Sequence, residues 1–109
     1  MIILGSMITI YRKKNYKIYD AGDNYIVHNT NLDFQDHHTH IKNFKTCKYI
    51  IDLCINKSVP DKHISDYLLI SILRLSNDNA YKYKIETLLY NNKLKKEKYN
   101  NGKQIGSVN

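Results

Sequence analysis

The sequence contains no tryptophan, one proline and only four glycines among its 109 residues. None of the glycines forms a phosphate-binding loop, and no serine stands between glycines as in a nucleophilic hydrolase. These absences argue against a nucleotide-binding loop and against serine-based catalysis. No apolar run reaches the roughly 18 residues of a membrane span, and residues 1–4 are too few for a signal-peptide core. We therefore expect a cytoplasmic protein with no membrane contact.

Cysteine is scarce as well. Cys47 and Cys54 are the two cysteines, and both fall in a segment predicted to be one helix. Their spacing places them on one helix face, about 10 Å apart along the axis. A disulfide needs Cα atoms within about 7 Å, so the two residues cannot bridge each other. We expect both to be buried thiols, as is usual in a reducing compartment.

Acidic residues are outnumbered, with ten Asp and Glu against seventeen Lys and Arg, which gives a formal charge of +7. Such an excess attracts polyanions, including nucleic acid and acidic protein surfaces. Solubility alone is the other explanation of the charge. The hydrophobic and charged fractions, 42% and 25%, are typical of a folded chain.

The length fits one domain, since domains typically contain about 100–150 residues. We assign this single domain to residues 7–94. Residues 1–6 are interpreted as a cloning remnant, because Gly5-Ser6 precedes a second methionine, Met7. Residues 95–109 are rich in Lys, Asn, Gly and Ser, and they are predicted to form a mobile basic and polar tail.

Residues 7–28 predict three strands, because β-branched and aromatic residues recur there in alternation with polar ones. Turns are expected at residues 13–15 and 20–24, where Asn, Asp and Gly tolerate the necessary backbone angles. Leu32 and Phe34 are expected to pin the following polar loop to the core. The strands should therefore form a three-stranded antiparallel meander.

Three helices are predicted after the loop. The first begins near Thr39 and carries apolar residues at helical spacing as far as Ile55. The second begins at Ser58, which forms a capping-box pattern with Asp61, and ends near Ser76. The third is capped by residues 77–79 and continues to about residue 94. The predicted fold class is α+β, a small antiparallel sheet of about three strands followed by three helices.

The second helix is apolar on nearly every side, so it is predicted to be the central, buried helix. Arg74 lies within it, and a guanidinium in an apolar environment needs a partner. Asp66 and Asp78 are the expected partners.

Histidines cluster at His37, His38 and His40. Such a cluster can bind a metal ion, transfer protons near neutral pH, or hold a loop by hydrogen bonds. Zinc sites usually draw paired ligands from two places in the sequence, and only one place is dense here. We favour the structural role and expect no cofactor. If the protein is an enzyme, it is a small ribonuclease acting through His38, His40 and Arg74, or a metal-dependent enzyme.

The first predicted hairpin carries cations among tyrosines 11, 16 and 19. Cations can neutralise phosphates while rings stack on bases, so this pattern indicates nucleic-acid binding. The candidate cations are Arg12, Lys13, Lys14 and Lys17, extended by Lys42, Lys45 and Lys48. A lysine-protected edge strand gives the same pattern, and a strand edge could also pair two copies of the chain into a homodimer. A helix-turn-helix centred on residues 57–62 is a further alternative.

Three segments together resemble small uncharacterised proteins encoded by phages and plasmids of low-GC Gram-positive bacteria. The segments are His38-Thr-His-Ile-Lys-Asn43, then Val59-Pro60, then Tyr67-Leu-Leu-Ile-Ser-Ile-Leu-Arg-Leu-Ser76 with Asp78 and Tyr81. The resemblance covers most of residues 25–90 and implies a setting in the cytoplasm of a host bacterium. Proteins of this kind are often inhibitors of host defence, such as anti-CRISPR proteins, or regulators of phage genes.

The sequence thus favours a non-enzymatic binding protein of a mobile element. Its expected partner is a host defence complex that handles nucleic acid, or nucleic acid itself. The alternatives are the small histidine-dependent enzyme and a nucleic-acid-binding transcriptional regulator.

Overall fold

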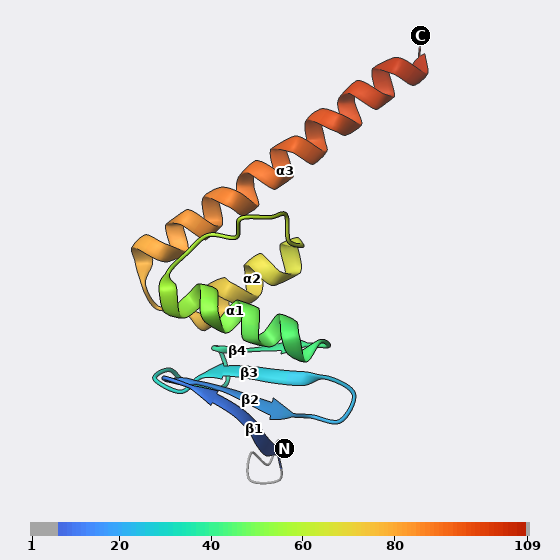
Figure 1. The fold of residues 1–109 in the computed structure, drawn as a ribbon. Coiled ribbons are helices and arrows are strands. Elements are labelled where there is room, and N and C mark those ends of the chain that lie inside the picture. The colour runs from blue at the N-terminus through green and yellow to red at the C-terminus, as the bar shows by residue number, and fades with distance from the viewer. Residues whose placement is uncertain (1–6, 109) are drawn as a thin grey trace.

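The structure, a computed structural model, describes the backbone of residues 7–108 and the side chains of residues 7–97. A four-stranded sheet lies at one end, α1 and α2 lie beside it, and α3 runs away as a long rod (Figure 1). The elements are β1 (Ile8–Lys13), β2 (Tyr16–Asp20), β3 (Tyr25–Asn29), β4 (His38–Ile41), α1 (Phe44–Asn56), α2 (Asp66–Leu75) and α3 (Asn79–Val108). The α+β class is confirmed, with four strands instead of about three. The expected cloning remnant, residues 1–6, lies outside the described residues.

The sheet is an antiparallel meander in the order β1-β2-β3-β4. The two predicted turns are confirmed, since Lys14 and Gly22 adopt positive φ angles of 53° and 97° between the first three strands. Glycine at position 22 meets that requirement without strain. Asn29 joins the end of β3 to α2, because its Nδ2 donates to the buried carbonyl oxygen of Leu75 at 2.8 Å.

The fourth strand corrects the prediction that a helix begins near Thr39. Thr39 and Ile41 are buried against the helices, whereas His38 and His40 point to the other side of the sheet. The helix begins instead at Phe44, after Asn43 caps its N-terminus by accepting a hydrogen bond from the backbone N–H of Thr46.

The core lies between one face of the sheet and helices α1, α2 and α3. Cys47 and Cys54 belong to it, and both are free and buried, as predicted. Thr39 and Ser71 are the polar pair inside it, and their hydroxyl oxygens lie 2.6 Å apart. The largest fully buried side chains are Ile18, Val27, Ile50, Ile51, Leu69, Ile72, Leu75 and Ile85.

Helix α2 begins later than predicted. Its N-cap is Ser65, whose Oγ accepts the N–H of Leu68, so the expected capping box at Ser58 and Asp61 is wrong. The connection from α1 spans residues 57–65, longer than the 3–4 residue turn of a helix-turn-helix. The helix is central, since it contacts α1, α3, β3 and β4. It is not buried all round, because Tyr67 and Ile70 are 54% and 46% exposed.

Helix α3 begins as predicted, with Asp78 accepting the N–H of Tyr81 and with Tyr81 and Ile85 in the core. It then continues to Val108, past the boundary predicted near residue 94. Lys and Glu in this segment favour helix even without an apolar stripe, and Lys96 is paired with Asp66 of α2 at 2.8 Å. The mobility of the tail stays a prediction. Within residues 7–108, no helix is long and apolar enough to cross a membrane.

Candidate functional site

The helices cover one face of the sheet, and the register brings a set of basic and aromatic side chains together on the other. Residues paired across antiparallel strands share a face, so the strands place two rows of side chains side by side. One row is Arg12, Lys17, His28 and His38, and the next is Thr9, Tyr19, Ile26 and His40. We call these two rows the open face.

The loop of residues 30–37 folds over part of the open face. The Phe34 ring stacks on the His38 ring, with centroids 4.3 Å apart and planes 3° from parallel. Its other neighbours are His28 at 5.2 Å and Tyr19 at 6.4 Å. The prediction that Leu32 and Phe34 pin this loop to the core is therefore wrong, because the loop packs on the opposite side of the sheet.

Hydrogen bonds tie two rings of the open face to this loop. His28 donates from Nε2 to the carbonyl oxygen of Leu32 at 3.0 Å, and His38 donates from Nδ1 to that of Phe34 at 2.6 Å. The Nδ1 atom of His28 is buried and has no partner among the described residues. Burial is the main cause that lowers the pKa of His28, and its neighbours His38 and Lys17 lower it further. His28 is therefore neutral near pH 7.

The metal hypothesis for His37, His38 and His40 is not supported. His37 turns away and donates from Nδ1 to Asp33 at 3.0 Å, while His38 and His40 point to the open face. Within the part of the chain that the structure describes, no three His, Cys, Asp or Glu side chains are placed to hold a metal ion. His37 lies in the loop before β4 and bonds within that loop, so only His38 and His40 of the three share a face.

The residues of the ribonuclease hypothesis do lie together. The rings of His38 and His40 have centroids 5.1 Å apart, and the Nε of Arg74 donates to the carbonyl oxygen of His38 at 2.8 Å. Burial, His38 and Arg74 lower the pKa of His40, so its imidazole is neutral near pH 7. Arg74 is thus held by the backbone of β4, and the catalytic hypothesis stays a prediction.

Arg74 does not pair with Asp66 or Asp78, as was expected from sequence. Asp66 is bound by Lys96 at 2.8 Å, and Asp78 is bound by Lys57 at 2.6 Å. The guanidinium is exposed and reaches β4 instead, so it needs no buried carboxylate.

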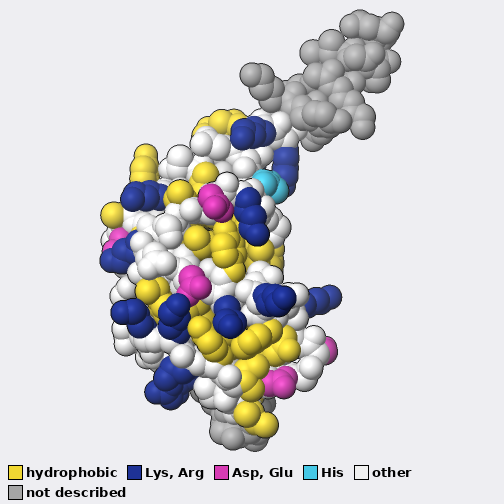
Figure 2. Space-filling view, viewed as in Figure 1, with side chains coloured by type: hydrophobic (Ala, Val, Ile, Leu, Met, Phe, Trp, Pro, Cys, Tyr) yellow, Lys and Arg dark blue, Asp and Glu magenta, His cyan; other side chains and the backbone are white. Residues whose placement is uncertain are grey.

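The predicted cations do not form one patch. Arg12 and Lys17 lie on the open face, whereas Lys13 turns to the helices and binds Asp52 at 2.7 Å. Lys48 lies over the ring of Tyr11, 5.3 Å from its centroid. Lys14 is in the first turn, Lys42 follows β4, and Lys45 is on α1. In the view of Figure 2, Lys and Arg side chains are spread over the sheet and helices, with few acidic side chains between them.

The three tyrosines of the predicted hairpin also lie on different faces of the sheet. Tyr16 is buried in the core and Tyr11 packs edge-on against Phe44, so of the three predicted rings only Tyr19 reaches the open face. Phe34 is the aromatic residue that sequence reasoning assigned to the wrong side of the sheet. The alternation of Thr39 and Ile41 with two histidines was a signal for strand β4, but not for the position of Phe34.

No family model, no curated protein and no solved structure matches this chain.

Proposed function

We propose that the open face binds single-stranded nucleic acid. The observation that carries the proposal is the pair of cations Arg12 and Lys17 on neighbouring strands, on the same face as the stacked, partly exposed rings of Phe34 and His38. Proteins that bind single strands without strong sequence preference combine cations along the backbone with rings on which bases stack.

The charge of the open face supports this ligand. Arg12 and Lys17 sit on neighbouring strands, and neither row contains an acidic residue. A phosphate backbone lying over β1 and β2 thus meets two positive charges, with no carboxylate on the same rows. Binding then releases counterions and weakens as salt rises.

The exposed rings of the open face favour a single-stranded ligand over a duplex. Tyr19, Phe34 and His38 are partly exposed, and their faces can be covered by a base only when that base is unpaired. The stacked pair is also fixed in position by the hydrogen bond from His38 to the loop, so little side-chain entropy is lost on binding.

The test is fluorescence anisotropy with labelled single- and double-stranded DNA and RNA across a salt series. We expect single strands to bind more tightly than duplexes, with an affinity that falls as salt rises. Replacing both Arg12 and Lys17 by Gln should weaken binding. It should also reduce the slope of log affinity against log salt concentration by about 1.4, since each lost phosphate contact accounts for roughly 0.7.

The matched control replaces two lysines of α3, Lys82 and Lys84, by Gln, since it removes the same charge far from the open face in the chain. If both double variants lose affinity equally, net charge explains the binding and the open face does not. If the protein binds no nucleic acid at low salt, the proposal fails, and the search moves to a protein partner.

The biological setting is also a proposal. The resemblance to small phage and plasmid proteins supports an inhibitor of host defence or a phage regulator, and a face that binds single strands suits either role. Co-purification with a nucleic-acid-handling defence complex, lost in the Arg12 and Lys17 double variant, is the result that this setting predicts.

A further inference from the structure

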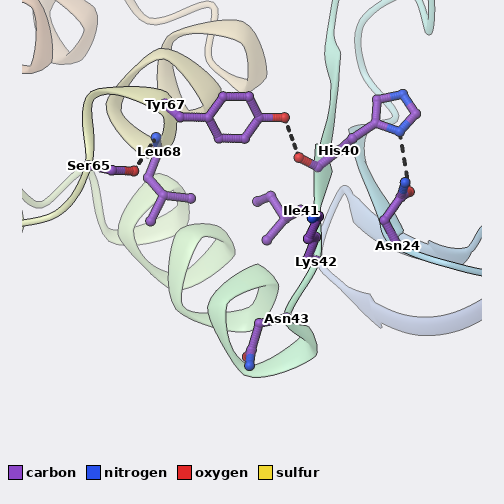
Figure 3. Close-up of a pocket in the computed structure, with 8 residues that line it drawn as sticks. All are labelled: Asn24, His40, Ile41, Lys42, Asn43, Ser65, Tyr67 and Leu68. Atoms are coloured by element: carbon purple, nitrogen blue, oxygen red, sulfur yellow. Dashed lines mark hydrogen bonds between the residues drawn. The ribbon is translucent and has the colours of Figure 1, made fainter.

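A cavity of about 450 Å³ lies at the end of β4, between the first turns of α1 and α2. Ile41 and Leu68 form its apolar base, and the ring of Tyr67 closes one side (Figure 3). The volume is within the range of about 300–1,000 Å³ that is usual for small-ligand sites. His40 belongs to both the cavity and the open face, so the two surfaces are continuous.

Tyr67 has the properties of a stacking platform. Its side chain is 54% exposed, yet it is held in place because its hydroxyl donates to the carbonyl oxygen of His40. Figure 3 shows the ring reaching from α2 toward β4 with this bond at its tip. A ring that is both exposed and fixed can stack on a base at a small cost in side-chain entropy.

The polar side chains around the cavity provide both donors and acceptors, since the Oδ1 atom of Asn24 also lines it. The Oδ1 atom of Asn43 accepts the N–H of Thr46, which leaves the Nδ2 amide hydrogens to point elsewhere. The Oγ atom of Ser65 accepts from Leu68, so its hydroxyl hydrogen is left to donate, and Lys42 adds an ammonium group. No Asp or Glu lines the cavity.

We infer that this cavity holds one base of the strand bound on the open face, stacked on the ring of Tyr67. The inference rests on the proposed function. Every base has donors and acceptors on its edge and a face that can stack, so these groups can meet any base without selecting one.

The experiment measures binding of labelled oligothymidylate at one salt concentration. Tyr67→Leu removes the ring and should weaken this binding about 5-fold or more, the effect of losing one stacked base. Tyr67→Phe keeps the ring and should retain most of the affinity. The matched control is Tyr83→Leu, an exposed tyrosine on α3 that lies outside the cavity and should change nothing.

Circular dichroism and thermal unfolding confirm that each variant is folded before binding is compared. A Tyr67→Leu variant that binds like Tyr83→Leu overturns the inference. In that case a weakened Arg12 and Lys17 double variant shows that the open face still binds. Absence of binding to the oligonucleotide overturns the inference together with the proposed function.

Discussion

Arg74 donates from Nε to the carbonyl oxygen of His38 at 2.8 Å, and so ties the exposed side of α2 to the outer edge of β4. Tyr67, two turns earlier on the same helix, donates its hydroxyl to the carbonyl oxygen of His40. These carbonyls belong to alternate residues of β4, so α2 covers the edge that β3 leaves unpaired. At the opposite edge, Ile8 and Ile10 of β1 are 68% and 42% exposed. The homodimer considered from the sequence stays a prediction, and β1 is the strand that it would use.

The first prediction concerns the hydrogen bond from Arg74 to the carbonyl oxygen of His38. Arg74→Lys keeps the charge but loses the planar Nε–H donor, so one carbonyl of β4 loses its protein partner. We expect a loss of about 0.5–1.5 kcal/mol in the free energy of unfolding, the usual contribution of one hydrogen bond. Urea denaturation at neutral pH measures the change.

The control for this prediction is Arg12→Lys, which makes the same chemical change at an exposed arginine of β1. We expect its free energy of unfolding to equal that of the unmodified protein. Equal destabilisation by both variants would show that the Arg74 hydrogen bond has no special role at the edge of β4.

The first three strands could be predicted because each shows alternation bounded by residues suited to turns. The fourth was missed because His38–Ile41 is short and polar, and it runs directly into the helical pattern of α1. Thr39 and Ile41 fit both a strand face and a helix start, and only the position of Asn43 as an N-cap separates the two. A strand of this length is fixed by tertiary contacts, here the pairing with β3 and the covering by α2.

The candidate site was predicted only in part, for a related reason. Arg12 and Lys17 lie on one face of the sheet and Lys13 lies on the other. The separation of Arg12 from Lys13 could be predicted from strand alternation. The neighbourhood of Phe34 and His38 depends on how a loop folds over the sheet, and loop paths have no periodic signal in sequence. The cavity beside Tyr67 depends on three elements meeting, so residue spacing could not indicate it.

The second prediction tests the polar pair in the core. Ser71 is 1% exposed, and its hydroxyl lies 2.6 Å from that of Thr39. Ser71→Ala leaves the Thr39 hydroxyl buried without this partner, which should cost about 1–3 kcal/mol in the free energy of unfolding. Combining it with Thr39→Val removes both hydroxyls and should recover most of the loss. A double variant as unstable as the sum of the single ones would contradict the pairing.

The third prediction concerns pH. The folded state lowers the pKa of His28 and of His40 below the ordinary value of 6.5, chiefly through burial. As the pH falls through 6.5, the unfolded chain therefore takes up protons that the folded chain does not. The two neutral histidines thus make their full contribution to stability above about pH 6.5. The free energy of unfolding should decrease as the pH falls from about 6.5 to 5. Carboxylates with lowered pKa values, such as Asp66 and Asp78, cause a further loss of stability, but mainly below about pH 5.

Urea denaturation at a series of pH values measures this effect. His28→Gln removes one titrating group and should reduce the slope of stability against pH in this interval. His63→Gln is the control, because His63 is exposed and lies outside the open face. An unchanged slope in His28→Gln would show that the histidine is equally easy to protonate in both states.

The fourth prediction uses the two thiols as reporters of the core. Cys47 and Cys54 are buried in α1, and burial raises their pKa values to about 11 and about 12. The thiolate is the reactive form, so the folded protein at pH 8 should react very slowly with an aromatic disulfide reagent. In denaturant both thiols should react at once, and the native rate then reports opening of the helix. Cys47→Ala and Cys54→Ala identify which thiol reacts. Rapid native reaction of either would mean that α1 separates readily from the sheet, and that the open face rests on a less rigid support than its packing indicates.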